Sequence, residues 1–366
     1  MSRNEETPGD GASDRHVRER SLADLQRLCQ SVAGEPLRGD VARTVGRIAE
    51  TPSRDSVTFA ADLVSRLGEG DRLLRSVAAK LVKVQHLRNL EPLFDDVPDG
   101  IGGPSVELRA CVLGELALIG SGTGRRSLDA YAEKLGELGH PLARLPRTRL
   151  DIEHRFTVRV RGLGSVKTAK QLRSRFPEVP STEGGTVAAR GAGEARDDGR
   201  ANAATRPFRA GGWAREPEAR VFTLPSPLSS DDFGISFIKE LPLRCLAGEG
   251  SRRGSAVACA TTPDDVLNEL FSASYVGGVN GQGQGGAYAR LYAWQSLYAL
   301  MGLPMAVPLL EAVRRAADHR WLRFMAFTDW FHHDTSDLAF AVLDPTRTRV
   351  AVLAATDTDV DGDVLG

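Results

Sequence analysis

The stretch LAFAVLDPTRTRVAVLAATDT, at Leu338–Thr358, decides the fold. It contains two runs that are apolar throughout, Leu338–Leu343 and Val350–Ala355, with an Asp-Pro turn between them. This pattern predicts a β-hairpin. A strand buried on only one face alternates polar and apolar residues, so both faces of these two strands must be covered. The stretch therefore predicts a layered α+β domain whose mainly antiparallel sheet ends in this hairpin.

An isolated hairpin is only marginally stable, so these strands need neighbours in a sheet. Short apolar runs between turn residues predict those neighbours, and longer apolar segments predict helices. Additional strands are expected at Ala219–Leu224, Ala256–Ala260 and Trp321–Phe327, and helices at Asp264–Ser274, Ala287–Met301 and Val307–Ala317.

The N-terminal part of the chain has a helical pattern instead. Leu22, Leu25 and Leu28 form one apolar stripe, and glycine or proline separates the segments that follow. Because no consensus recurs at a fixed period, an irregular helical bundle is favoured over a short helical array built from repeats. Helices are expected at Val57–Leu67, Leu73–Leu90, Val106–Ile119 and Ser127–Leu138.

Between Glu183 and Gly212 the chain is rich in Gly, Ala, Arg and Asp, and Val187 and Phe208 are its only larger apolar residues. So few apolar side chains do not offset the entropy lost on ordering, which predicts a flexible linker. The expected organisation is a disordered N-terminus (1–20), a helical domain (21–150), a basic segment with a low-complexity linker (151–217), an α+β domain (218–357) and an acidic tail (358–366).

The overall composition excludes several classes of protein. The 47 basic and 48 acidic residues nearly cancel, so no overall field draws the chain to nucleic acid or to a membrane. Cys29, Cys111, Cys245 and Cys259 form no C-x-x-C pair, which argues against a zinc ribbon or a disulfide framework. The sequence shows no signal peptide, and no apolar run approaches the roughly 20 residues that span a bilayer. We therefore expect a cytoplasmic protein without a membrane segment.

Gly281, Gly283 and Gly286 in NGQGQGGAY satisfy the G-x-G-x-x-G pattern ahead of a helix. The free amides in the first turn of a helix can hold a phosphate or a carboxylate. A dinucleotide fold also needs a strand before the glycines and an acidic residue about 20 positions further on, and both are missing here. A surface loop is therefore favoured over a nucleotide site.

The helix after this loop, AYARLYAWQSLYALM, is apolar nearly all round and should be buried. Arg290 lies one turn inside it. Because an unpaired guanidinium is costly to remove from water, Arg290 must reach outward, pair with a carboxylate or meet an anionic ligand. The first two alternatives are favoured. We nevertheless hypothesise that the loop and Arg290 line a shallow pocket.

The segment TDWFHHDTSD carries Asp329, His332, His333, Asp334 and Asp337, a set that suggests a metal site. Adjacent histidines point in different directions, and the i, i+4 histidine pair is missing, so a polar loop before the hairpin is favoured. The tail DTDVDGDVLG begins like an EF-hand loop but ends before the glutamate that closes the calcium cage. No metal is assigned to either segment.

The segment from Pro141 to Phe176 carries ten basic residues against only Asp151 and Glu153. Such a strip can bind phosphates with a marked salt dependence. It lacks interleaved aromatic residues and any groove-reading motif, and the whole chain is neutral, so nucleic acid is kept only as a second alternative. The residues that would contact it are Arg159, Arg161, Lys167, Lys170 and Arg173.

Several short motifs carry a family resemblance. They are HPLARLP at His140–Pro146, EARVF at Glu218–Phe222, LRCLAG at Leu243–Gly248, AYARLYAWQSL at Ala287–Leu297 after the glycine loop, and VLAATDTD at Val352–Asp359. With these motifs the chain resembles an uncharacterised actinobacterial family that is catalogued only as a domain of unknown function. The resemblance implies no activity and carries over no catalytic residue.

The motifs G-x-S-x-G, H-E-x-x-H, the P-loop lysine and the kinase set are absent from the sequence, which lowers the expectation of an enzyme without removing it. Because helical domains commonly present surfaces to other proteins, we predict a binding module with a protein partner of unknown identity and no cofactor. The alternative is an enzyme or a small-anion-binding protein with a site near residues 277–290. Its ligand-binding residues would be Gly283, Gly286, Tyr288, Arg290, Asp329 and His332, with no catalytic residue assigned.

Overall fold

The computed structural model describes residues 45–67, 71–156, 183–247, 256–281, 283–331 and 336–358. Within these ranges the strands form one six-stranded sheet in the order β1-β2-β6-β5-β4-β3, and every neighbouring pair is antiparallel. The strands are β1 (Gly193–Ala195), β2 (Glu218–Thr223), β3 (Ala256–Ala260), β4 (Arg320–Ala326), β5 (Leu338–Leu343) and β6 (Arg349–Ala355).

The predicted hairpin is β5–β6, and it lies in the middle of the sheet. Leu338 pairs with Ala355, and Leu343 pairs with Val350. Every residue of β5 is buried, and β6 is buried apart from its first residue, Arg349. The expectation that both faces of this hairpin are covered is confirmed.

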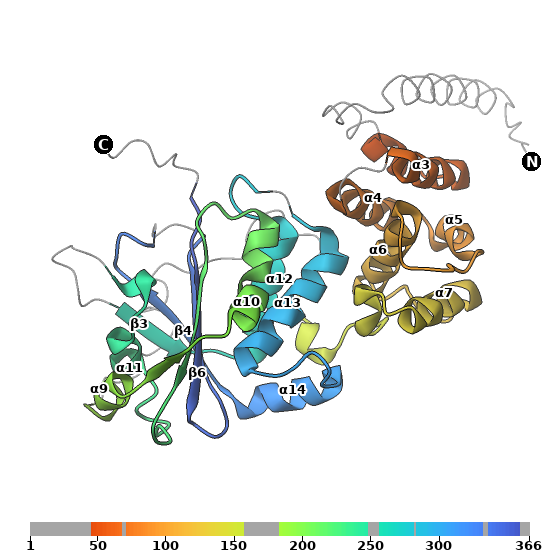
Figure 1. The fold of residues 1–366 in the computed structure, drawn as a ribbon. Helices are drawn as coiled ribbons and strands as arrows, with labels where there is room; N and C mark the ends of the chain where they lie inside the picture. The colour runs from red at the N-terminus through yellow and green to blue at the C-terminus, as the bar shows by residue number, and fades with distance from the viewer. Residues whose placement is uncertain are drawn as a thin grey trace, which may run out of the picture.

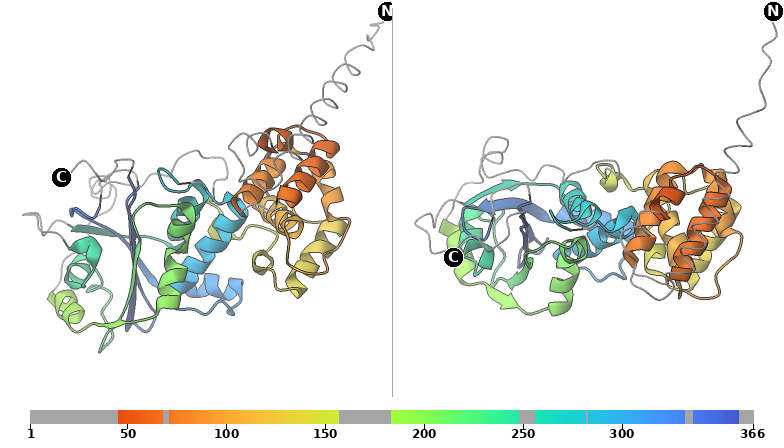
Figure 2. Two further views of the ribbon diagram at one scale, coloured as in Figure 1. Left: turned by 45° about the horizontal axis from the view of Figure 1, so that its top comes forward. Right: turned by 90° about the horizontal axis from the view of Figure 1, so that it is seen from above.

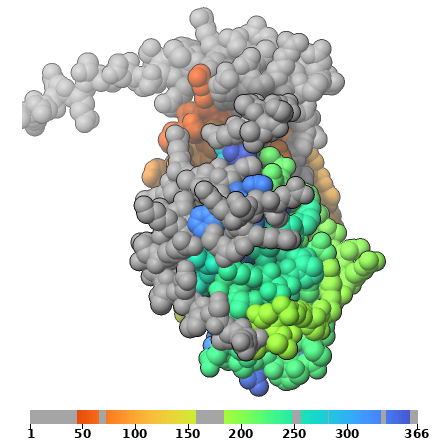
Figure 3. All heavy atoms as spheres, turned by 90° about the vertical axis from the view of Figure 1, so that its left-hand side faces the viewer, coloured from red at the N-terminus to blue at the C-terminus, as the bar shows by residue number. Residues whose placement is uncertain are grey.

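Helices cover the two faces of the sheet in separate layers (Figure 1). One face packs on a four-helix layer through residues such as Phe340 and Leu353, and the other packs on α9 and α11 through residues such as Ala341 and Val352. On that second side α9 and α11 form part of the outer surface (Figure 3). The helices are α10 (Asp198–Gly211), α12 (Pro263–Val276), α13 (Gly285–Met301) and α14 (Leu309–Asp318) on one face, and α9 (Glu183–Arg190) and α11 (Ile235–Glu240) on the other.

The described N-terminal part is helical, as predicted, and its helices are together called the helical array below. The predicted helix at Leu73–Leu90 is divided in two, because the chain leaves the helix near Gln85, whose side chain donates hydrogen bonds to two backbone carbonyls. The array consists of α3 (Arg54–Leu67), α4 (Asp71–Val84), α5 (Leu87–Leu90), α6 (Pro104–Leu118) and α7 (Arg126–Glu137), with 3-10 turns η1 (Glu91–Phe94), η2 (Pro141–Arg144) and η3 (Asp151–Glu153).

The apolar helix that the sequence predicted is α13, and it joins the two parts of the molecule. Every residue from Gly286 to Met301 is buried except Gln295. Its first half, including Leu291, packs into the core of the helical array, and its second half, including Leu297, packs into the core beneath the sheet. Figure 2 shows α13 between the array and the sheet in both views. The prediction that this helix is buried is confirmed.

The segment predicted as a flexible linker is instead ordered where the structure describes it. Residues 183–212 form α9, β1 and α10, and α10 packs against α13 and α12. Asp197 caps α10 by accepting a hydrogen bond from the backbone N–H of Arg200, and Gly212 ends the helix with a left-handed φ of 71°. Phe208 is fully buried. The prediction was wrong because alanines let α10 lie close to its neighbours, so little apolar volume is needed to bury it.

Gly114 of α6 packs closely against α13. A Cβ atom added to Gly114 would lie 2.5 Å from the Cβ of Ala287 on α13. Real carbon atoms do not approach so closely, so the crossing of these two helices depends on a glycine at this position.

We therefore expect Gly114→Ala to destabilise the protein by about 1–3 kcal/mol through overpacking, although alanine is the better helix former. Gly136→Ala in α7 is the matched control, because nothing lies within 4 Å of the added Cβ. This control should gain about 0.5–1 kcal/mol. Urea unfolding of both variants measures the difference, and equal gains would show that the crossing tolerates a side chain.

Candidate functional site

The predicted anion site at the start of α13 is occupied by a carboxylate of the protein itself. Glu115, on α6, accepts a hydrogen bond of 3.0 Å from the backbone N–H of Ala287. A Cβ on Gly286 would lie 2.7 Å from a carboxylate oxygen of Glu115, so the glycine makes room for this carboxylate. The first-turn amides and the helix dipole favour a negative charge here. Glu115 therefore takes the position that a ligand anion would take.

The Glu115 carboxyl is buried, and burial raises its pKa to about 7 in spite of the hydrogen bonds from Ala287 and Gly286, which lower it. A pKa near neutrality means that this group changes charge within the physiological range.

Arg290 is paired with a carboxylate, one of the two structural alternatives that the sequence left open. Its Nε donates to Oε1 of Glu153 at 2.7 Å, and its Nη2 donates to Oε2 at 2.8 Å. Nη1 and Nη2 also donate to the carbonyl oxygens of Pro146 and Thr148. Arg290 is 1% exposed and Glu153 is fully buried. The guanidinium is therefore bound on all three nitrogens by the protein.

Glu153 also accepts hydrogen bonds from two other groups. The indole Nε1 of Trp294, one turn along α13, donates to Oε1 at 2.7 Å. The backbone N–H of Leu150 donates to Oε2 at 2.8 Å. A buried ion pair of this kind is stable only when its remaining hydrogen-bonding positions are filled, and here they are.

Tyr288 belongs to a third buried polar cluster, between α13, α4 and α6. The guanidinium of Arg75 lies 3.7 Å from the centre of the Tyr288 ring, a cation–π distance. His140 Nε2 lies 3.2 Å from Glu107 on α6. Burial raises the pKa of the Glu107 carboxyl, but hydrogen bonds from His140 and Tyr288 outweigh burial and hold it below its usual value.

Cys111 lies within the same cluster and is a fully buried free thiol. Burial raises the pKa of this thiol well above its ordinary value, and the nearby Glu107 carboxylate raises it further. A nucleophilic cysteine needs a lowered pKa and access to substrate. Cys111 has neither property, so it is a packing residue.

The glycine loop before α13 is fixed by Asp357, from the TDTD motif. The Asp357 carboxylate accepts hydrogen bonds from the backbone N–H groups of Ala214 and Val279, at 3.0 and 2.7 Å. Gly283 lies so close to the chain that an added Cβ would be 1.9 Å from the carbonyl oxygen of Tyr275. The glycines of this loop therefore serve close backbone packing.

The structure brings together only some of the predicted ligand-binding residues. Gly286, Tyr288 and Arg290 lie along the first turns of α13, but each faces a different protein partner. Asp329 lies on the loop after β4, where its carbonyl oxygen accepts from Arg215. His332 lies outside the described residues.

The basic residues assigned to nucleic acid, Arg159, Arg161, Lys167, Lys170 and Arg173, also lie outside the described residues, so that assignment stays a prediction. Within the described ranges, no group of three or more His, Cys, Asp or Glu side chains is placed to hold a metal ion. None of the helices in these ranges combines the length and the apolar character needed to cross a bilayer.

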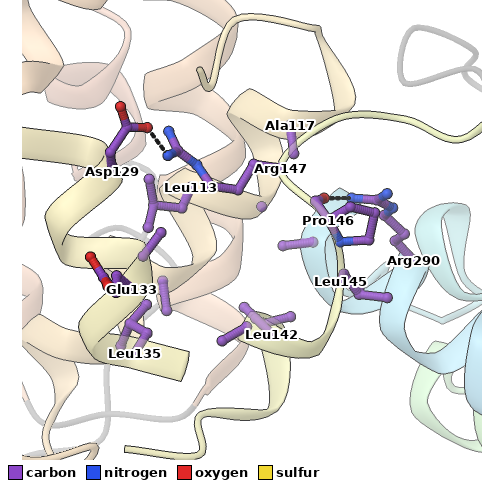
Figure 4. A pocket seen from close by; sticks show the side chains of 15 residues that line it. Leu113, Ala117, Asp129, Glu133, Leu135, Leu142, Leu145, Pro146, Arg147 and Arg290 are labelled. Carbon is purple, nitrogen blue, oxygen red and sulfur yellow. Dashed lines mark hydrogen bonds and ion pairs between the residues drawn. The ribbon is translucent and has the colours of Figure 1, made fainter. Parts of the chain in front are cut away.

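A cavity of about 250 Å³ lies beside α13, between α6, α7 and η2 (Figure 4). Its wall is aliphatic, with no aromatic ring among the lining side chains. Leucines from α6, α7 and η2 point into it, and Arg147 reaches across to Asp129 on α7, with which it forms an ion pair. The apolar wall includes Leu113, Ala117, Leu135, Leu142, Leu145 and Pro146.

This cavity was not predicted from the sequence, although one motif supplies part of its wall. The HPLARLP motif supplies Leu142, Leu145 and Pro146, which line it, and His140 begins the same turn. The motif contributed to the family resemblance, but nothing in its spacing indicates that α6 and α13 lie opposite it. That placement depends on contacts between residues far apart in the sequence.

A second cavity, of about 200 Å³, lies between α10 and the edge of the sheet. Four of its charged residues form two ion pairs, Arg200 with Asp197 and Arg220 with Glu194. The cavity beside α13 is the better candidate site, because most of its wall is apolar.

The fold and the site define an α+β protein in which a helical array and a layered antiparallel sheet share one buried helix, with an aliphatic cavity beside that helix. The chain belongs to a family of unknown function, DUF6183, whose model matches residues 14–359. The resemblance to a domain of unknown function is thereby confirmed. Neither a curated protein nor a solved structure matches the chain.

Arg290→Ala should lower the free energy of unfolding by about 3–5 kcal/mol, because it leaves the buried Glu153 carboxylate without its counter-ion. Arg314→Ala, which removes an exposed partner of Glu311 on α14, is the control and should leave the stability unchanged. Guanidinium unfolding followed by tryptophan fluorescence compares them. An Arg290→Ala protein as stable as the control would show that the pair contributes nothing.

Glu115 predicts a pH dependence of stability. Its folded-state pKa of about 7 lies above its ordinary 4.5, so between these values the native state holds a proton that the unfolded state has released. Stability should therefore fall as the pH rises from about 4.5 to 7, by about 3 kcal/mol in total.

Glu115→Gln removes the titrating group and should flatten this part of the pH profile. Glu137→Gln, at an exposed position of α7, is the control and should keep the wild-type slope. Chemical unfolding at several pH values gives both profiles. A wild-type slope in the Glu115→Gln protein would assign the pH dependence to other groups.

Proposed function

We propose that this protein is a binding module whose ligand site is the cavity beside α13, and that the ligand places an aliphatic group in it. The observation that supports this proposal is the aliphatic wall of the cavity, to which the array and α13 both contribute. Small-molecule sites are concave and mostly apolar, with a few polar groups that orient the ligand.

The size of the cavity sets the size of the group that enters it. A cavity of about 150 Å³ is enough for benzene, and drug-sized ligands need about 300–1,000 Å³. At about 250 Å³ the cavity suits one branched aliphatic chain. Because Leu113 on α6 and Ala287 on α13 both line it, an occupant would contact both parts of the molecule.

The rival function, an enzyme or an anion-binding protein at residues 277–290, has less support. Its polar groups already have partners within the protein: Glu115 lies against the first turn of α13, and Glu153 binds Arg290. A ligand anion would have to displace one of these buried carboxylates. We therefore rank binding in the cavity first.

A protein partner and a cytoplasmic location are further parts of the proposal. The helical array supports a protein partner, by analogy with other helical proteins. The buried thiols of Cys111 and Cys245, which form no disulfide, support a cytoplasmic location, because disulfides are rare in a reducing compartment.

The test is binding of 3-methyl-1-butanol, a neutral branched aliphatic probe, followed by saturation-transfer NMR. Ala132→Leu on α7 adds a larger side chain to the cavity wall and should abolish the signal. Ala130→Leu, at an exposed position of the same helix, should retain it. Equal signals from the two variants, or no signal from the wild-type protein, would contradict the proposal.

A further inference from the structure

A short segment without helix or strand, Leu145–Thr148, forms one side of the cavity beside α13 and is called the strap below. Leu145, Pro146 and Arg147 of the strap line the cavity (Figure 4). Within the described residues, positions 146–148 take part in no backbone-to-backbone hydrogen bond. The strap is therefore held by contacts that involve side chains, and the strength of those contacts decides which side of it opens.

The contact between the strap and α13 is firm. Arg290 donates from Nη1 to the carbonyl oxygen of Pro146 at 2.8 Å and from Nη2 to that of Thr148 at 2.9 Å. The same guanidinium is 1% exposed and is paired with the fully buried Glu153 carboxylate. Charge-assisted hydrogen bonds in a buried network are strong, because water does not compete for them. The strap is therefore fixed on its α13 side.

The contact between the strap and α7 is weaker. It is the ion pair that Arg147 forms with Asp129 across the cavity (Figure 4). The Asp129 side chain is 49% exposed and the Arg147 side chain is 24% exposed, so water and salt screen the pair. An ion pair with this exposure adds little to stability. The α7 side is therefore the side on which the strap can open.

The exposure of the lining residues shows which end of the cavity faces solvent. Asp129 and Glu133 on α7 are exposed, whereas Ala117 on α6 and Ala287 on α13 are each 2% exposed. The outer end of the cavity thus lies at α7, and its deep end lies at α6 and α13. The ion pair between the strap and α7 stands at the outer end.

We propose that the strap is a gate to the cavity. It pivots on its hydrogen bonds with Arg290, and the Arg147–Asp129 ion pair is the latch that keeps it closed. When the latch breaks, the strap moves away from α7 and the deep wall of the cavity meets solvent, while the buried Arg290–Glu153 pair stays intact. This inference rests on the function proposed above for the identity of the occupant, but the movement is measured without one.

Thiol labelling of the full chain tests the gate. Ala117→Cys places a thiol at the deep wall of the cavity. Native Cys111, which is buried in the same helix and is not a lining residue, reports any opening of the whole array. Methyl methanethiosulfonate is the probe, and fragment-ion mass spectrometry gives the labelling rate at each of the two positions.

Asp129→Asn, added to Ala117→Cys, removes the latch. It should raise the labelling rate at position 117 by about two- to fivefold, the effect of losing a partly exposed ion pair, and leave the rate at Cys111 unchanged. Lys134→Met breaks an exposed ion pair with Glu137 on the same helix, neither partner of which lines the cavity. It is the control and should change neither rate.

Salt gives a second measurement of the latch. Sodium chloride at about 1 M should raise the labelling rate at position 117 when Asp129 is present, because it screens the ion pair, and should not raise it further in the Asp129→Asn protein. Where Ala117→Cys does not fold, Ala110→Cys on the same helix repeats both measurements, since Ala110 also lines the cavity and is 1% exposed.

The outcomes separate the gate from the proposed function. Equal acceleration at both thiols would assign the labelling to unfolding of the array and overturn the gate. An unchanged rate at position 117 in the Asp129→Asn protein would also overturn it and would leave the cavity as the binding site. The expected rates in a protein that does not bind 3-methyl-1-butanol would support the gate and contradict the proposed function alone.

Discussion

The burial of α13 is the constraint on which the rest of the structure depends. A helix that is apolar on every side is stable only where protein covers its whole circumference. The helical layer beneath the sheet covers its second half, and the array covers its first half. Gly114 brings α6 into contact with it, and the alanines of α10 do the same from the opposite part of the fold. The array and the sheet are therefore parts of one structure around a shared helix.

The buried charged groups along α13 are paired with groups of the protein itself. Arg290 is balanced by Glu153, which comes from a short 3-10 turn in the segment that leaves the array. The first-turn amides of α13 are balanced by Glu115. These contacts fix the orientation of α6 and of the segment around η3 against α13.

The sequence predicted the hairpin, the additional strands and the buried helix, because apolar segments of this kind are stable only in the protein interior. It did not predict α10, because the alanines of this helix do not indicate burial until the helices that pack against them are known. For the Arg290 guanidinium, the sequence left three environments open: solvent, a carboxylate of the protein, or an anionic ligand. It could not identify Glu153 as the partner, because Glu153 is distant in the sequence. The cavity was not predicted for the same reason: its walls come from four segments that the topology alone brings together.

The shared helix also has an evolutionary consequence. A domain can move between genes only if it keeps a complete core after separation, and here the first half of α13 completes the core of the array while lying in the later part of the chain. A gene fragment encoding the sheet alone would produce a protein with Tyr288, Leu291 and Tyr292 uncovered. Exchange of either part by gene fusion is therefore disfavoured, which agrees with a single family model that spans both parts.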